Sequence, residues 1–75
     1  MKQVHHLTCV IDREGDGFVS LCPDLDIASQ GATREEAKAN LIEAVELFFE
    51  TADPAEVRSR LHTDVEVVPI EVRVG

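Results

Sequence analysis

Carboxylates are the most abundant side chains in this sequence that could take part in catalysis. The chain has fifteen Asp and Glu residues, and hydrolysis by paired metal ions needs several carboxylates around one point. The segment 4–11 has the pattern of a first strand and contains no acid, and Asp12 stands at its turn end. Glu66 and Glu71 fall on a later predicted strand, at positions that alternate to opposite faces. We therefore expect surface or structural carboxylates, with no catalytic residue and no metal site.

Histidine and cysteine also lack the spacing of a reactive site. His5 and His6 are adjacent on the first predicted strand, so their side chains point to opposite faces and suit joint metal binding poorly. Cys9 and Cys22 fall on neighbouring predicted strands, which leaves a disulfide open as an alternative. Two small buried thiols are the favoured interpretation in a reducing compartment. No cofactor is expected.

A row of acids on the main predicted helix suggests binding. Glu43 and Glu46 are three residues apart, and Glu46 and Glu50 are four apart, so like charges are neighbours on the helix surface. Lys38 lies nearer the apolar side and does not relieve them. Such a row suits a basic partner, and a solvated helix face is the alternative. The candidate partner-binding residues, with two acids from the preceding loop, are Asp24, Asp26, Glu35, Glu43, Glu46 and Glu50.

The overall charge supports the same preference. Fifteen acids against seven Lys and Arg give a net charge of −8, which repels nucleic acid, because affinity for phosphates comes from basic side chains. The same field attracts a basic protein, and solubility is the alternative purpose. No apolar run approaches the roughly 20 residues that cross a bilayer. We expect a single cytoplasmic domain over residues 1–75, without direct nucleic-acid or membrane binding.

A β-hairpin is predicted near the N-terminus. The first strand, Val4–Asp12, is rich in β-branched residues and places alternate apolar side chains on one face. A second strand, Phe18–Cys22, follows a loop over residues 13–17 that contains two glycines. A five-residue loop places Ile11 opposite Val19, which would make one face of the sheet apolar.

Turn and capping signals divide the middle of the chain. Pro23 ends the second strand, because proline cannot donate a hydrogen bond to a sheet. A short third strand is expected at Ile27–Ser29, and Gly31 should break it. Thr33 then has the pattern of a helix N-cap, and Glu36 completes a capping box with it. Together with Gly17, these residues form the structural motif: Gly17, Pro23, Gly31, Thr33 and Glu36.

The second half is predicted to contain a long helix, a short helix and a last strand. The long helix covers residues 34–50, and the short one begins after the cap Asp53 and ends near Leu61. Val65–Val74 alternates as a strand with Pro69 at a sheet edge, joined in parallel beside the first strand. This gives an α+β fold of order β-β-β-α-(α)-β with about four strands and one main helix on one face. The expected apolar arc of that helix is Ala37, Leu41, Ala44, Val45 and Phe48.

The same organisation resembles the HicB-type antitoxin family over about residues 4–74. The resemblance rests on Gly17-Phe18, on Pro23-Asp24-Leu25, and on residues 29–33 followed by Glu35-Glu36-Ala37. It implies a partial ribonuclease-H-like fold and a HicA-like toxin as partner, a small basic protein that cleaves RNA with a histidine. The antitoxin in such pairs covers the toxin. Residues 26–28 differ from the family's usual Pro-Gly-Cys, and the sequence to Gly75 contains no DNA-binding extension, so autorepression by this chain alone is not expected.

The expected function is therefore that of a HicB-like protein that occludes a small basic ribonuclease toxin. Two alternatives stay open: a metal-dependent nuclease of ribonuclease-H type, and an orphan oligomeric interaction module. A four-stranded sheet has two edges that need covering. Pro69 blocks one edge, and the short third strand at the other edge is free to pair with a second copy or with a toxin strand. We expect a homodimer or homotetramer.

Overall fold

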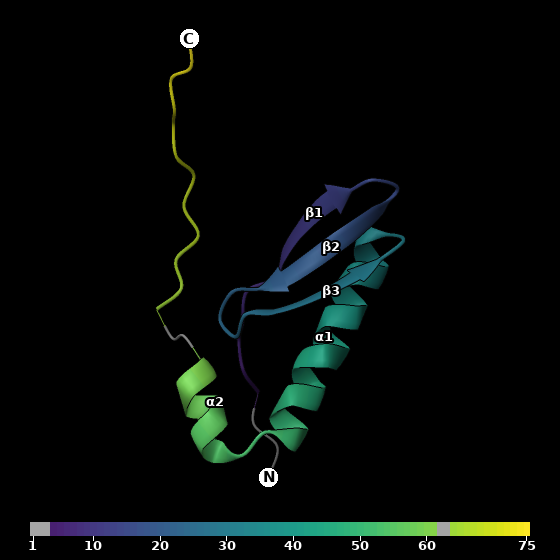
Figure 1. The fold of residues 1–75 in the computed structure, drawn as a ribbon, viewed down its shortest axis with the longest axis vertical. Helices are drawn as coiled ribbons and strands as arrows, with labels where there is room; N and C mark the ends of the chain where they lie inside the picture. The colour runs from purple at the N-terminus through teal and green to yellow at the C-terminus, as the bar shows by residue number, and fades with distance from the viewer. Residues whose placement is uncertain (1–3, 62–63) are drawn as a thin grey trace.

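A three-stranded antiparallel sheet with a long helix against one face forms the body of the protein (Figure 1). The computed structural model describes residues 4–61 and 64–75, and it confirms the α+β class. Strand order in the sheet is β1-β2-β3, so β2 is central and each neighbour pairs with it antiparallel. The elements are β1 (Val10–Glu14), β2 (Gly17–Cys22), β3 (Ile27–Gly31), α1 (Arg34–Thr51) and α2 (Pro54–Arg60).

The hairpin between β1 and β2 is tighter than the sequence suggested. Glu14 pairs with Gly17 across a two-residue turn, and Gly15 at its first position has φ +59, the conformation in which type II′ hairpins favour glycine. As a result Ile11 pairs with Ser20, so the predicted pairing of Ile11 with Val19 is wrong by one residue. A one-residue shift moves a strand's side chains to the other face. The strand also begins at Val10, six residues later than predicted.

Small residues of β2 and β3 lie under α1. The Ser20 hydroxyl is buried and donates a hydrogen bond of 2.8 Å to the backbone oxygen of Ala37. Gly31 ends β3, two residues beyond the predicted strand end, and a Cβ there would lie 2.5 Å from the Ala37 nitrogen. A Cβ at Gly17 would lie 3.0 Å from the Gly31 oxygen. Small residues at Ser20 and Gly31 therefore let α1 approach the sheet closely, and Gly17 leaves room for the Gly31 oxygen of the neighbouring strand.

The core lies between α1, the end of β2 and the loop that follows it. Leu25, Cys22 and Leu41 are buried together, and Ala37 is also buried. The predicted apolar arc of α1 is confirmed, with its remaining members half-buried. Partly buried side chains complete the cluster: Leu7, Ile27, Val45, Phe48, Phe49 and Leu61.

Both helices begin at the predicted caps. The Thr33 hydroxyl accepts the Glu36 N–H at 3.0 Å, and the Glu36 carboxylate accepts the Ala32 N–H at 3.1 Å. Asp53 accepts the Glu56 N–H at 2.9 Å, with Pro54 as the first residue of α2. These bonds satisfy N–H groups that have no partner inside a helix.

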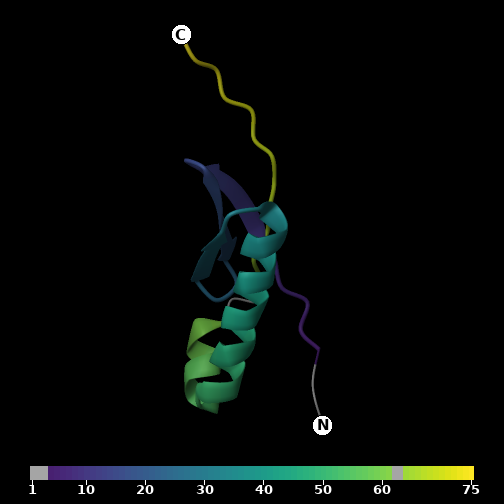
Figure 2. The same cartoon turned by 90° about the vertical axis from the view of Figure 1, so that its right-hand side faces the viewer.

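The predicted last strand is absent from the described residues. Val65–Val74 is extended, pairs with no strand there and leads away from the sheet and both helices (Figures 1 and 2). Val65 is half-buried and residues 66–75 are exposed. The sheet therefore has three strands where about four were expected. Alternating apolar residues indicate that a segment suits a sheet, and they do not specify which edge it joins.

Candidate partner-binding surface

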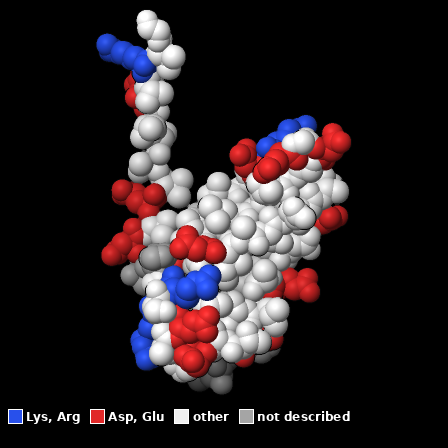
Figure 3. Space-filling model, viewed as in Figure 1, with Lys and Arg blue, Asp and Glu red and all other residues white. Residues whose placement is uncertain are grey.

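The exposed side of α1 carries four predicted site residues, which we call the acidic stripe: Glu35, Glu43, Glu46 and Glu50. All four are exposed. At about 100° per residue they lie within an arc of about 80°, opposite the residues that face the sheet. Red atoms follow the margin of the molecule where α1 lies (Figure 3). The structure therefore brings four of the six predicted binding residues onto one surface.

The helix itself does little to neutralise the acidic stripe. Glu50 lies in the last turn of α1, which has no basic residue, and the negative end of the helix dipole disfavours a carboxylate there. The pairs Glu43–Glu46 and Glu46–Glu50 each cost a few tenths of a kcal/mol in an isolated helix. Glu35 lies in the first turn, where the helix dipole favours a carboxylate, so only Glu43, Glu46 and Glu50 carry this small cost to helix stability.

Several arginines that might have balanced the acids lie over aromatic rings instead. The guanidinium carbons of Arg13 and Arg34 lie 5.2 and 4.7 Å from the centroid of the Phe18 ring. That of Arg60 lies 5.3 Å from the Phe48 centroid. Cations at these distances interact with the ring face. Three positive charges are thereby held at the hairpin and at α2.

Asp24, a predicted binding residue, is a structural group. It is 7% exposed, and its carboxylate accepts the Thr8 N–H at 2.9 Å and lies 3.6 Å from the Cys22 sulfur. Burial raises the pKa of the Cys22 thiol, and the neighbouring Asp24 carboxylate raises it further. Asp24 therefore ties the N-terminal segment to the loop after β2 and is not available to a partner. Both Cys22 and the exposed Cys9 are free thiols.

The loop that contains Asp24 is held from both sides. Leu25 is completely buried, and its backbone oxygen accepts two hydrogen bonds from the Arg60 guanidinium, at 2.9 and 3.3 Å. Asp26, the remaining predicted residue, is exposed and has φ +56, so the chain turns sharply into β3. The sequence marked this loop by Pro23 and its acids. It gave no sign of the contact with Arg60, which is 35 residues away.

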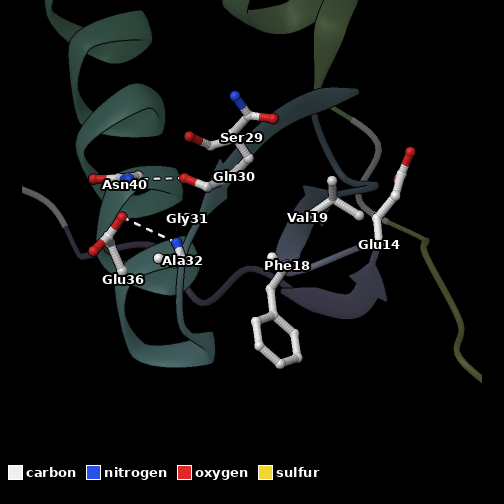
Figure 4. A pocket seen from close by; sticks show the side chains of 10 residues that line it. Glu14, Phe18, Val19, Ser29, Gln30, Gly31, Ala32, Glu36 and Asn40 are labelled. Atoms are coloured by element: carbon white, nitrogen blue, oxygen red, sulfur yellow. Dashed lines mark hydrogen bonds between the residues drawn. The ribbon is translucent and has the colours of Figure 1, made fainter.

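An open hollow of about 680 Å³ lies at the other end of the sheet, between the hairpin, the end of β3 and the first turns of α1 (Figure 4). Its polar groups bond to one another: the Asn40 side-chain amide donates to the Gln30 backbone oxygen at 2.7 Å, and the Glu36 carboxylate accepts the Ala32 N–H. The acidic stripe does not line this hollow. The hollow is therefore a feature separate from the candidate surface.

The residues weighed for metal chemistry do not converge. Among residues 4–61 and 64–75, no three His, Cys, Asp or Glu side chains are grouped so that they could hold a metal ion. The His5 ring stacks on Phe49, with centroids 4.7 Å apart and planes 12° from parallel.

Across residues 4–61 and 64–75, neither helix combines the length and the hydropathy needed to cross a membrane.

Comparison with known proteins places the chain in a family. No family model and no solved structure matches it. The chain is 37% identical to the UPF0150 protein ssr1765 of Synechocystis sp. in an alignment of length 75, which covers 97% of this chain and 94% of that protein. An alignment that spans nearly both chains at this identity shows common descent, and the chain belongs to the UPF0150 family.

Proposed function

We propose that this protein is a HicB-like antitoxin that binds a small basic ribonuclease toxin and blocks its access to RNA. The observation that carries the proposal is the acidic stripe: four exposed carboxylates on one side of α1, without a basic residue among them. The resemblance at Gly17-Phe18, Pro23-Asp24-Leu25 and residues 29–37 supports the same function. Asp26 is exposed and remains a candidate contact.

Charge gives this surface two roles. A net charge of −8 attracts a basic protein from a distance and speeds the encounter. At contact, each carboxylate of the stripe can accept hydrogen bonds from Lys or Arg, and such charge-assisted bonds are stronger than neutral ones. Because α1 is fixed to the sheet through Ala37 and Leu41, the stripe is presented on a rigid element. Little order then has to be gained on binding.

Occlusion requires no chemistry from the antitoxin. A HicA-like toxin cleaves RNA with a histidine and binds phosphates with basic side chains. A row of carboxylates competes for those cations, and the body of the domain covers the RNA-binding surface of the toxin. In this proposal the protein acts in the cytoplasm by protein contact, without binding nucleic acid, metal or cofactor.

The decisive experiment reverses the charge of the stripe. The triple variant Glu43→Lys, Glu46→Lys and Glu50→Lys should weaken binding of the HicA-like toxin by about a hundredfold or more, measured by calorimetry. The matched control, Glu14→Lys, Asp16→Lys and Glu56→Lys, makes the same change in net charge at exposed positions away from the stripe. Circular dichroism should show both variants folded.

The control separates local contact from overall charge. If both triple variants weaken binding equally, the effect comes from net charge and the stripe is not the interface. If the stripe variant binds like the wild type, the proposal fails at its main observation. Loss of RNA protection by the stripe variant alone, in a cleavage assay with the toxin, would support occlusion.

A further inference from the structure

The segment 65–74 has the pattern of a strand and lacks a partner among the described residues. Val68, Ile70, Val72 and Val74 alternate along it and are 57%, 80%, 73% and 94% exposed. Large apolar side chains in a row are costly to leave in water, and such rows mark interaction sites. Glu71 and Arg73 occupy the alternate positions. One face of the segment is therefore apolar from Val68 to Val74, and the other is polar only toward its end, at Glu71 and Arg73.

Pro69 determines which side of this segment can pair. Successive N–H groups of a strand point to opposite sides, and proline has none. The side on which Pro69 would have donated is the side that must face solvent. Val68, Ile70 and Val72 then direct their N–H groups toward a neighbour. The segment is thus suited to become the outermost strand of a sheet.

The edge of β1 is the better acceptor on the body of the protein. The sheet ends at β1 and at β3. At the β3 edge, the Gln30 oxygen already accepts the Asn40 amide at 2.7 Å. Within the described part of the chain, no strand pairs with β1 on the side away from β2. Ile11, which lies on the face of β1 toward α1, is only half-buried. An apolar strand beside β1 would complete the cover of Ile11.

We propose that two copies of this chain exchange these segments, so that 65–74 of each pairs with β1 of the other. The segment leads away from its own sheet (Figures 1 and 2), which leaves it free to reach a second copy. Reciprocal exchange has twofold symmetry and fills both β1 edges, so that assembly closes at the dimer. A single copy buries only four apolar residues in its described part, and association is a common source of stability at this size.

The exchange is independent of the proposed toxin and has the opposite salt dependence. Two chains of charge −8 repel each other, so added salt should strengthen the dimer. Salt should weaken the binding of a basic partner for the same reason. The two proposals can therefore fail separately.

Light scattering of the full chain tests the exchange. The wild type should be a dimer at about 50 µM, and Ile70→Lys should raise the dissociation constant by about a hundredfold or more, because one apolar side chain is lost at each of two sites. Glu71→Lys introduces the same residue next to it on the polar face and should leave the dimer intact. A monomeric wild type, or a dimer that survives Ile70→Lys, would overturn the proposal.

Disulfide trapping distinguishes a second copy from the chain's own sheet. Cys9 is exposed directly before β1, whereas Cys22 is buried. A cysteine introduced singly at Val68, Ile70 or Val72 should oxidise with Cys9 of the other copy and give a covalent dimer on a non-reducing gel. Cys9→Ser should abolish that dimer. An internal disulfide in a monomer would show that the segment folds back on its own β1 and would rule out exchange.

Discussion

Gly31→Ala adds one methyl group and should lower the free energy of unfolding more than the same change at another glycine of this protein. The new Cβ would lie 2.5 Å from the Ala37 nitrogen and 2.8 Å from the Glu36 carbonyl carbon. Both neighbours are backbone atoms, and ordinary contacts begin near 3.4 Å. The first turn of α1 would therefore have to move away from β3 by about 1 Å. That movement would stretch the 2.8 Å hydrogen bond from Ser20 to the Ala37 oxygen.

The magnitude follows from these two effects. Overpacking of this kind costs about 1–3 kcal/mol, and loss of a buried hydrogen bond adds about 1 kcal/mol. We expect Gly31→Ala to lower the free energy of unfolding by about 2–4 kcal/mol. Gly15→Ala provides the comparison, because that residue has φ +59 and no atom within 4 Å of the added Cβ. Its cost should be about 1 kcal/mol, from backbone strain alone.

Urea unfolding followed by circular dichroism measures both variants at one protein concentration, so that any self-association is held constant. We expect a clearly lower urea midpoint for Gly31→Ala than for Gly15→Ala. Equal midpoints, or a Gly31→Ala variant within about 0.5 kcal/mol of the wild type, would refute the close approach of β3 to α1.

Two further predictions concern the loop and the core. Arg60→Ala should lower the free energy of unfolding, measured by thermal melting, by about 1.5–3 kcal/mol, because the Leu25 backbone oxygen loses two charge-assisted hydrogen bonds and the Phe48 ring loses the guanidinium over it. Arg58 is exposed on the same helix, so Arg58→Ala should change the free energy of unfolding little in the same measurement. The raised pKa of Cys22 means that the folded state holds the thiol proton more tightly, so stability should fall as pH rises above the usual thiol value of 9.0. Cys22→Ala should remove that decline in pH-dependent urea unfolding, and an equal decline in this variant would assign it to another group.

Local signals in the sequence were sufficient for the helices. The caps Thr33 and Asp53 act on N–H groups three residues away, so their pattern is contained in a few residues. The apolar arc of α1 follows from helical period alone. These predictions did not depend on how distant parts of the chain meet.

Features that depend on distant parts of the chain were harder to predict. A two-residue turn in place of a five-residue loop shifted the pairing of Ile11, because Gly15 and Gly17 allowed either turn. The sequence around Asp24 predicted an exposed acid, yet its side chain is buried and its carboxylate accepts the Thr8 N–H. The segment after residue 64 has the periodicity of a strand, but pairing needs an available edge, which periodicity does not specify.

The central claim is that the acidic stripe on α1 receives a basic partner. The most direct test is the salt dependence of the affinity between this protein and a HicA-like toxin, compared between the wild type and the Glu43, Glu46 and Glu50 lysine variant. We predict that wild-type affinity falls steeply with added salt, and that the stripe variant binds weakly with little salt dependence. Equal affinities with equal salt slopes would contradict the account.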